Sequence, residues 1–133
     1  MIYVLDANAM IALLRKEPGG DVVANRVAEP DATVYAHAIN LCEVYYAFHR
    51  EESEAAASGV IVDLKDLGVI ERNDFDETFW KEVGRLKATH RASIADFCAI
   101  ALTNRLGGTL LTSDHHELDL LAVAGVCQIE FIR

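Results

Sequence analysis

Short apolar runs alternate along this chain with longer segments in which apolar residues recur every three or four positions. The runs predict buried strands, because a strand covered on both faces is apolar throughout. The longer segments predict amphipathic helices, whose residues three and four apart share a face. The predicted strands are 2–5, 33–36, 69–72, 109–112 and 126–132. The predicted helices are 8–16, 21–28, 39–49, 52–67, 74–89 (starting at Asp74 or Asp76), 93–105 and 115–124.

The regular alternation of strand and helix predicts the α/β fold class. We expect a three-layer α/β/α domain with a central, mainly parallel sheet flanked by helices on both faces. No linker, internal repeat or low-complexity segment divides the chain. Residues 1–133 are therefore expected to form a single domain.

The composition narrows the class of protein further. Hydrophobic residues make up 52% of the 133 positions and charged residues 25%, as in a globular rather than a disordered chain. No apolar run approaches the ~20 residues of a membrane helix, and the N-terminus has no signal-peptide pattern. We expect no membrane association. Three cysteines lack metal-ligand spacing and are interpreted as reduced core residues, which favours a cytoplasmic location: Cys42, Cys98 and Cys127.

The formal net charge of −9 argues against a protein held to nucleic acid mainly by a basic surface. It does not exclude a nuclease, because clustered acids bind divalent cations that reverse the sign of the local field. One basic run precedes Asp96 and comprises Lys81, Arg85, Lys87, His90 and Arg91. Either a phosphate-contacting surface or an ordinary solvated helix face would account for this run.

Four acids stand at positions where a carboxylate needs an explanation. Asp6 and Asp114 each follow a predicted buried strand, and parallel strands end at the same edge of a sheet. Glu43 and Asp96 each lie in the first turn of a predicted helix, inside an apolar run. We expect all four side chains to meet at that edge.

Converging carboxylates raise one another's pKa, and hard divalent cations such as Mg²⁺ and Mn²⁺ relieve the repulsion. Such a site suits metal-assisted hydrolysis of phosphodiester bonds. Each acid alone also fits a structural role. Asn40 and Glu43, like Ser93 and Asp96, have capping-box spacing, and Asp6 or Asp114 would cap the helix that follows it. The joint occurrence of four acids favours the functional interpretation. Asn8 is a further candidate N-cap of the first helix.

The segments that carry these acids resemble the PIN-domain family, and within it the VapC-like ribonuclease toxins of type II toxin–antitoxin systems. The matching segments are Val-Leu-Asp-Ala-Asn (4–8), Ile-Asn-Leu-Cys-Glu-Val (39–44), Ser-Ile-Ala-Asp (93–96) and Leu-Thr-Ser-Asp (111–114). Their order, their spacing and the total length agree over essentially the whole chain. The ordered set carries the resemblance, since no single segment is specific.

The resemblance implies a metal-dependent endoribonuclease with one or two Mg²⁺ or Mn²⁺ ions. Asp6 and Asp96 would contact the metal most directly, and Glu43 and Asp114 would complete the site. Asn8 and Thr112 resemble the residues that support these acids through hydrogen bonds. The resemblance also implies an RNA substrate (often tRNA), a cognate antitoxin and a homodimer.

Four further residues lie close to the fourth acid, Asp114, in the sequence. Leu118 stands where family members commonly carry an aromatic residue, and helical spacing points Asp119 toward solvent rather than the site. His115 and His116 are adjacent, so they diverge on a helix and are not expected to chelate one ion.

Two other functions share many of these features: a non-catalytic α/β binding module with structural acids, and a housekeeping RNA-processing PIN nuclease.

Overall fold

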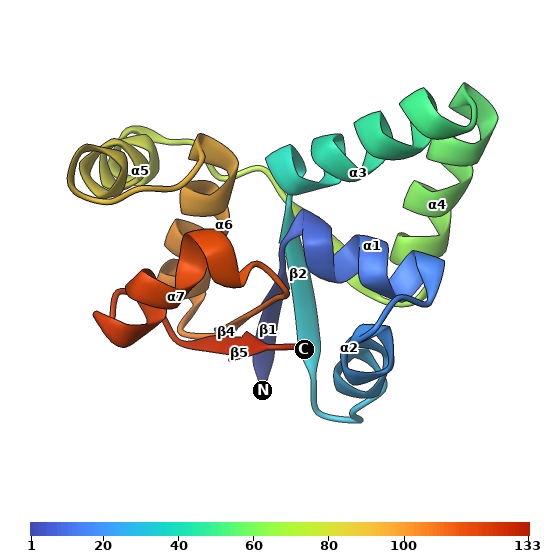
Figure 1. The fold of residues 1–133 in the computed structure, drawn as a ribbon, viewed down its shortest axis with the longest axis horizontal. Coiled ribbons are helices and arrows are strands. Elements are labelled where there is room, and N and C mark those ends of the chain that lie inside the picture. Colours follow the sequence, from blue (N-terminus) through green and yellow to red (C-terminus); the bar gives the residue numbers. More distant parts are fainter.

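The centre of the protein is a five-stranded, entirely parallel sheet, with strand order β3-β2-β1-β4-β5 (Figure 1). The computed structural model describes residues 1–133. The strands are β1 (Ile2–Leu5), β2 (Thr33–His37), β3 (Val69–Arg72), β4 (Thr109–Thr112) and β5 (Ile129–Phe131). The helices are α1 (Ala7–Arg15), α2 (Gly20–Val27), α3 (Ala38–Glu51), α4 (Glu54–Asp66), α5 (Glu77–Thr89), α6 (Ile94–Leu106) and α7 (His115–Val123). The predicted three-layer α/β/α fold is confirmed.

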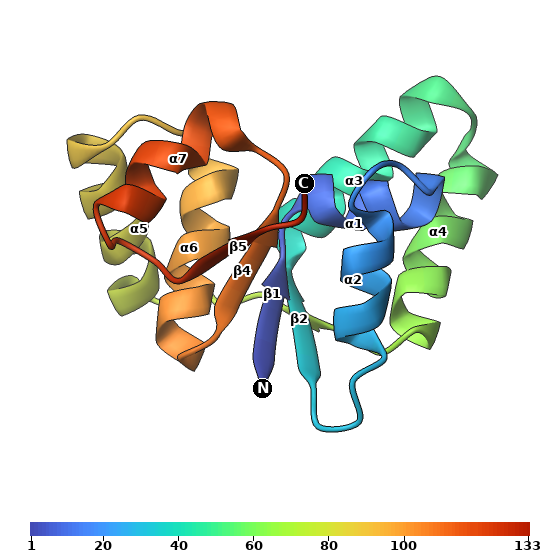
Figure 2. The same ribbon diagram turned by 60° about the horizontal axis from the view of Figure 1, so that its bottom comes forward.

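Helices cover both faces of the sheet, and each face has its own apolar core (Figure 2). Side chains alternate between the faces along each strand. In β1, Tyr3 and Leu5 pack in the core that includes α1 to α4, whereas Val4 packs in the core that includes α5 to α7. Burial on both faces explains why β1 is apolar along its whole length.

The strand order reverses beside β1. The chain runs from β1 to β2 and β3 on one side, and later adds β4 and β5 on the other side. The crevice outside the carboxyl ends of two strands at such a switch point is the usual ligand site of an open α/β sheet. Asp6 follows β1 directly, and Asp114 lies two residues beyond β4.

Among the boundaries that differ from the prediction, two reflect helix caps and one reflects a turn before a strand. Asp6, not Asn8, is the N-cap of α1. His37 caps α3, because its Nδ1 accepts the Ile39 N–H at 3.1 Å. The predicted strand 126–132 is ordered as a strand only at Ile129–Phe131, since the chain first turns at Gly125, which has a φ of +70°.

The core differs from the prediction at one cysteine. Cys98 and Cys127 are buried, but Cys42 is exposed on the outer side of α3. The prediction for Cys42 was wrong because its apolar neighbours in sequence lie on a different face of the helix. No helix has both the length and the apolar character needed to span a lipid bilayer.

Candidate functional site

The four predicted acids line one small cavity at the switch point of the sheet. Its volume is about 170 Å³, far above the ~10–15 Å³ that one water needs. The lining residues are Asp6, Ala7, Asn8, Glu43, Ser93, Asp96 and Asp114. Residues from β1, α3, α6 and the end of β4 thus reach one place, although Asp6 and Asp114 are 108 positions apart.

Asp6 is the most buried of the four acids, with 3% of its surface exposed. Its Oδ1 accepts the Ala9 N–H at 2.8 Å, whereas its Oδ2 is buried and has no hydrogen-bond partner. Burial raises the pKa of Asp6 to about 7; the neighbouring Thr112 hydroxyl and the Ala9 amide oppose this rise, and the charges of Asp96 and Asp114 add to it. An unpaired buried acceptor costs about 1–3 kcal/mol in the absence of a ligand.

Asp96 is held by the capping box at the start of α6. Its Oδ2 accepts the Ser93 N–H at 3.0 Å, and the Ser93 hydroxyl accepts the Asp96 N–H at 3.0 Å. Burial raises the pKa of Asp96, and the charges of Asp114 and Glu117 raise it further. The capping role and a role in the cavity are therefore compatible for this acid.

Glu43 is positioned by a residue whose role was predicted wrongly. Asn40 was expected to cap α3, but it is buried within the helix, with 1% of its surface exposed. Its Nδ2 donates to Glu43 Oε1 and to the Ala95 carbonyl oxygen, both at 3.3 Å. Asn40 therefore ties α3 to the start of α6, next to Asp96. Residues three apart share a helix face, so the spacing of Asn40 and Glu43 was the available signal.

Burial of the Glu43 carboxylate raises its pKa, while the Asn40 hydrogen bond opposes the rise. The nearby charge of Asp96 adds to it. Glu43 is exposed when the whole residue is considered. The carboxylate of Glu43 is thus the part of the side chain that lines the cavity.

Asp114 caps α7 by accepting the Glu117 N–H at 3.0 Å with its Oδ1. Thr112 is fully buried at the end of β4, and its hydroxyl accepts the Asp114 N–H at 3.0 Å. The same hydroxyl favours the ionised form of Asp6. Thr112 thus lies between two of the acids, whereas Asn8 lines the cavity without a side-chain hydrogen bond.

One pattern holds for all four acids: one carboxylate oxygen accepts a hydrogen bond from the protein and the other accepts none. The occupied oxygens are Oδ1 of Asp6, Oε1 of Glu43, Oδ2 of Asp96 and Oδ1 of Asp114. The hydrogen bonds orient the carboxylates, and the remaining oxygens are available to a ligand.

These residues fit a hard divalent cation. All the donors are oxygens, and the cavity contains a buried acceptor without a partner. No group of three or more His, Cys, Asp or Glu side chains is arranged to hold a metal ion. Mg²⁺ needs no such cage, since it binds through one or two carboxylates and retains several waters.

The histidines near Asp114 lie outside the cavity. His115 stacks on Phe131 with ring centroids 4.1 Å apart, and its two nitrogens contact Asp119 Oδ1 and the Arg133 carbonyl oxygen, each at 2.7 Å. The exposed Asp119 therefore helps to anchor α7 to the C-terminus. Leu118 is buried in the core beside α6.

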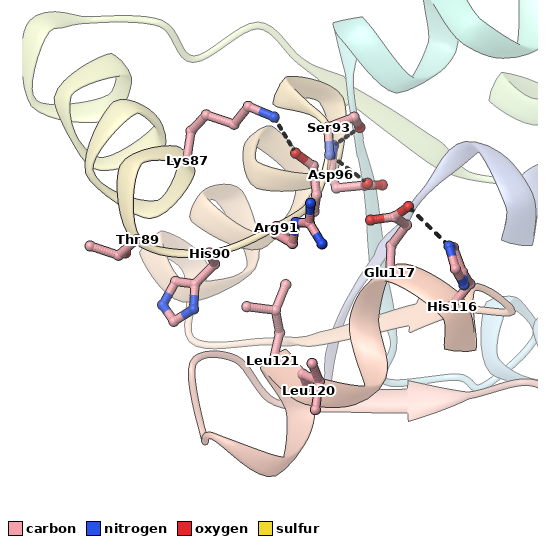
Figure 3. A pocket seen from close by; sticks show the side chains of 11 residues that line it. Lys87, Thr89, His90, Arg91, Ser93, Asp96, His116, Glu117, Leu120 and Leu121 are labelled. Carbon is pink, nitrogen blue, oxygen red and sulfur yellow. Dashed lines mark hydrogen bonds and ion pairs between the residues drawn. The ribbon is translucent and has the colours of Figure 1, made fainter.

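A larger groove of about 940 Å³ adjoins the cavity and shares Ser93 and Asp96 with it (Figure 3). One wall is the segment 87–93, which comprises the end of α5 and the connection to α6, and the other belongs to α7. The basic run divides here. Lys87, His90 and Arg91 line the groove, whereas Lys81 and Arg85 pair with glutamates on α5.

The chain was also compared with known proteins. A family model described as PIN domain matches residues 3–124. No curated protein matches the chain.

Solved structures with the same fold include several toxin–antitoxin proteins. VapBC2 from Rickettsia felis, bound to a promoter DNA fragment, has a TM-score of 0.72 at 18% identity, covering 98% of both chains. VapC20 from Mycobacterium tuberculosis, a sarcin-ricin loop cleaving toxin, has a TM-score of 0.72 at 16% identity, covering 94% of this chain and 95% of that one. A toxin–antitoxin complex from Klebsiella pneumoniae has a TM-score of 0.75 at 14% identity, covering 98% of both.

Proposed function

Because the chain belongs to the PIN-domain family, we propose that it is a metal-dependent endoribonuclease that hydrolyses RNA phosphodiester bonds. The observation that carries the proposal is the meeting of four carboxylates in one cavity, each with one oxygen unoccupied. We further propose that residues 1–133 form one PIN domain.

In this proposal Asp6 and Asp96 hold the ion, and Glu43 and Asp114 complete its surroundings. When bound, Mg²⁺ or Mn²⁺ would lower the pKa of the attacking water and stabilise the negative charge on the leaving oxygen. The protein keeps the carboxylates in place. The Ala9 amide orients Asp6, and fixed donors of this kind require no reorganisation during the reaction.

The remaining supports act in the same way. Ser93 orients Asp96, and Asn40 orients Glu43. Thr112 lies between Asp6 and Asp114, where its hydroxyl favours ionised Asp6. Hydrogen bonds within α1, α3, α6 and α7 thus together set the positions of the free carboxylate oxygens.

We propose that the protein is the toxin of a VapBC-type pair, that it acts in the cytoplasm as a homodimer and that a cognate antitoxin neutralises it. Support comes from the fold shared with VapBC2 and with the Klebsiella pneumoniae complex. An RNA substrate is supported by the fold shared with VapC20. A housekeeping PIN nuclease would have the same cavity, so a neighbouring antitoxin gene distinguishes the two.

The test is cleavage of a total-RNA pool by the purified protein with Mg²⁺, Mn²⁺ or EDTA. We expect cutting that requires metal and is abolished in Asp6→Asn and Asp96→Asn. Asp63→Asn is the matched control, because Asp63 is an exposed acid on α4, outside the cavity. Full cleavage by the Asp6→Asn/Asp96→Asn double variant would refute the proposed site.

A second function is favoured by one observation: Asp6 and Asp114 are helix N-caps, and Asp96 completes the capping box of α6. In a non-catalytic binding module this would be their whole role. Well-folded protein, free of any co-purified partner, that cuts no RNA with either metal would favour the binding module. A gain in stability of the metal-free protein on replacing Asp6 by Asn would favour a self-repelling acid cluster over acids that only cap helices, independently of activity.

A further inference from the structure

Arg91 is unusual among the arginines of this chain. Seven of the eight arginines hydrogen-bond an acceptor of the protein. The Arg91 side chain makes no hydrogen bond and no ion pair, although the chain carries a net charge of −9. A guanidinium that has no partner among so many acids remains available for an external anion.

The position of Arg91 indicates which anion it would meet. It lies on the wall 87–93 of the groove that shares Ser93 and Asp96 with the acid cavity. Figure 3 shows the side chain projecting into the groove opposite Glu117 and Leu121. The Lys87 ammonium donates to the Ala92 carbonyl oxygen at 2.6 Å, which holds a second positive charge on the same wall.

The opposite wall offers apolar surface. Leu120 on α7 is 82% exposed and lines the groove together with Leu121. The groove therefore has a cationic side, a side on which these two leucines stand beside His116 and Glu117, and an end at the acid cavity. An RNA strand matches all three, since it carries phosphates on one edge, sugars and bases on the other, and a phosphate to be cleaved.

We propose that this groove binds the single-stranded RNA segment on one side of the scissile phosphate, and that Arg91 contacts a phosphate of that segment. The inference rests on the proposed nuclease function. Guanidinium binds phosphate with two parallel hydrogen bonds, a contact that positions a strand without selecting its sequence.

The test measures binding separately from cleavage. Anisotropy of a fluorescent single-stranded RNA is recorded in EDTA over a range of salt concentrations for wild type, Arg91→Gln and Arg85→Gln. We expect Arg91→Gln to raise Kd about five- to tenfold and to reduce the slope of log K against log salt by about 0.7. Arg85→Gln should match wild type, because the Arg85 guanidinium is engaged by Glu82 outside the groove.

Steady-state cleavage with metal gives the second readout. Arg91→Gln should raise KM by a similar factor with kcat unchanged, and Arg91→Lys should recover part of the affinity. The melting temperature should not change, since Arg91 makes no polar contact that the variant loses.

Several outcomes would overturn the inference. One is an Arg91→Gln protein that binds RNA and cleaves it with wild-type Kd and KM, which would leave the nuclease function intact. Another is a loss of antitoxin affinity with unchanged RNA binding, which would assign the groove to a protein partner. If wild type itself neither binds nor cuts RNA with any metal, the proposed function fails, and this inference fails with it.

Discussion

Replacement of Asp6 by Asn should stabilise the metal-free protein at neutral and alkaline pH, although the residue is nearly fully buried and caps a helix. Ionised Asp6 lies in a poorly solvated cavity with Asp96 and Asp114 nearby, and its Oδ2 has no donor. Asn has a similar shape and keeps an oxygen to accept the Ala9 N–H. The substitution therefore removes a self-repelling charge and keeps the cap.

The magnitude follows from the pKa. Burial raises the pKa of Asp6 from 3.8 to about 7, and each pKa unit corresponds to about 1.36 kcal/mol. Ionisation in the folded state thus costs at most about 4 kcal/mol. The amide nitrogen of Asn becomes a buried donor that offsets about 1–3 kcal/mol of this if it stays unpaired. We expect a net gain of about 1–3 kcal/mol at pH 8.

The sign of the pH dependence is also determined. The folded-state pKa is raised, so the unfolded chain loses the proton first, and wild-type stability falls as pH rises from about 4 to 7. Asp6→Asn lacks this loss. The difference between the two proteins should therefore grow across this window and remain constant above it.

The assay is thermal and urea unfolding in EDTA between pH 4 and 8, with Asp63→Asn as the exposed control. For a chain of this size, 1 kcal/mol corresponds to about 3–5 °C in Tm. The control should change stability by less than about 0.5 kcal/mol. Added Mg²⁺ should stabilise wild type more than Asp6→Asn, because a ligand of the folded state stabilises according to its affinity. A variant that is less stable than wild type at pH 8 would refute the reasoning.

Three further predictions concern other parts of the molecule. Arg72 and Arg105 hold the pKa of Asp74 down at about 2, and its side chain is only 9% exposed; Asp74→Asn should therefore lose up to about 2 kcal/mol at pH 7. Because this folded pKa is depressed, the difference should disappear as pH falls from about 4 to 2 in urea unfolding curves, and a difference that persists at pH 2 would contradict the cause. Asn40→Leu removes the donor that orients Glu43 and should lower kcat about 10–100-fold, measured in the RNA cleavage assay; wild-type kcat in a folded variant would show that Asn40 only packs. Gly20→Ala would place a Cβ against the Ala12 carbonyl oxygen and should destabilise the fold by about 1–3 kcal/mol, whereas Gly59→Ala on α4 meets nothing within 4 Å and should stabilise it by about 0.5–1 kcal/mol. Equal Tm shifts in the two variants would contradict this.

Much of the fold follows from local patterns that the sequence carries openly. The run 2–5 is apolar throughout and 109–112 has two leucines at its centre, and in the structure both are central strands whose side chains pack on both faces of the sheet. The acids at the ends of such strands were expected at one edge, because parallel strands share their direction. The structure places Asp6 and Asp114 just beyond the carboxyl ends of β1 and β4, the two strands beside the switch point.

The errors share a cause: they depend on the direction of a side chain rather than on the type of element. Asn40 and Cys42 both lie in an apolar segment, yet one is buried against α6 and the other is exposed. Two helix N-caps also differ from the residues expected there. Asp6 caps α1 in place of Asn8, although a capping role for Asp6 was one of the alternatives, and His37 at the end of β2 caps α3 in place of Asn40.

The sequence by itself thus determined the layers, the strand direction and the edge at which the acids gather, because hydrophobic periodicity specifies which residues must be buried. Only the tertiary structure decided how each acid is held and which of its oxygens remains free, since the donors come from neighbouring turns and, for Glu43, from Asn40. It likewise separated Arg91 from Arg85. Both lie in one basic run, but the groove beside Asp96 is formed by α7, a distant part of the chain that packs there.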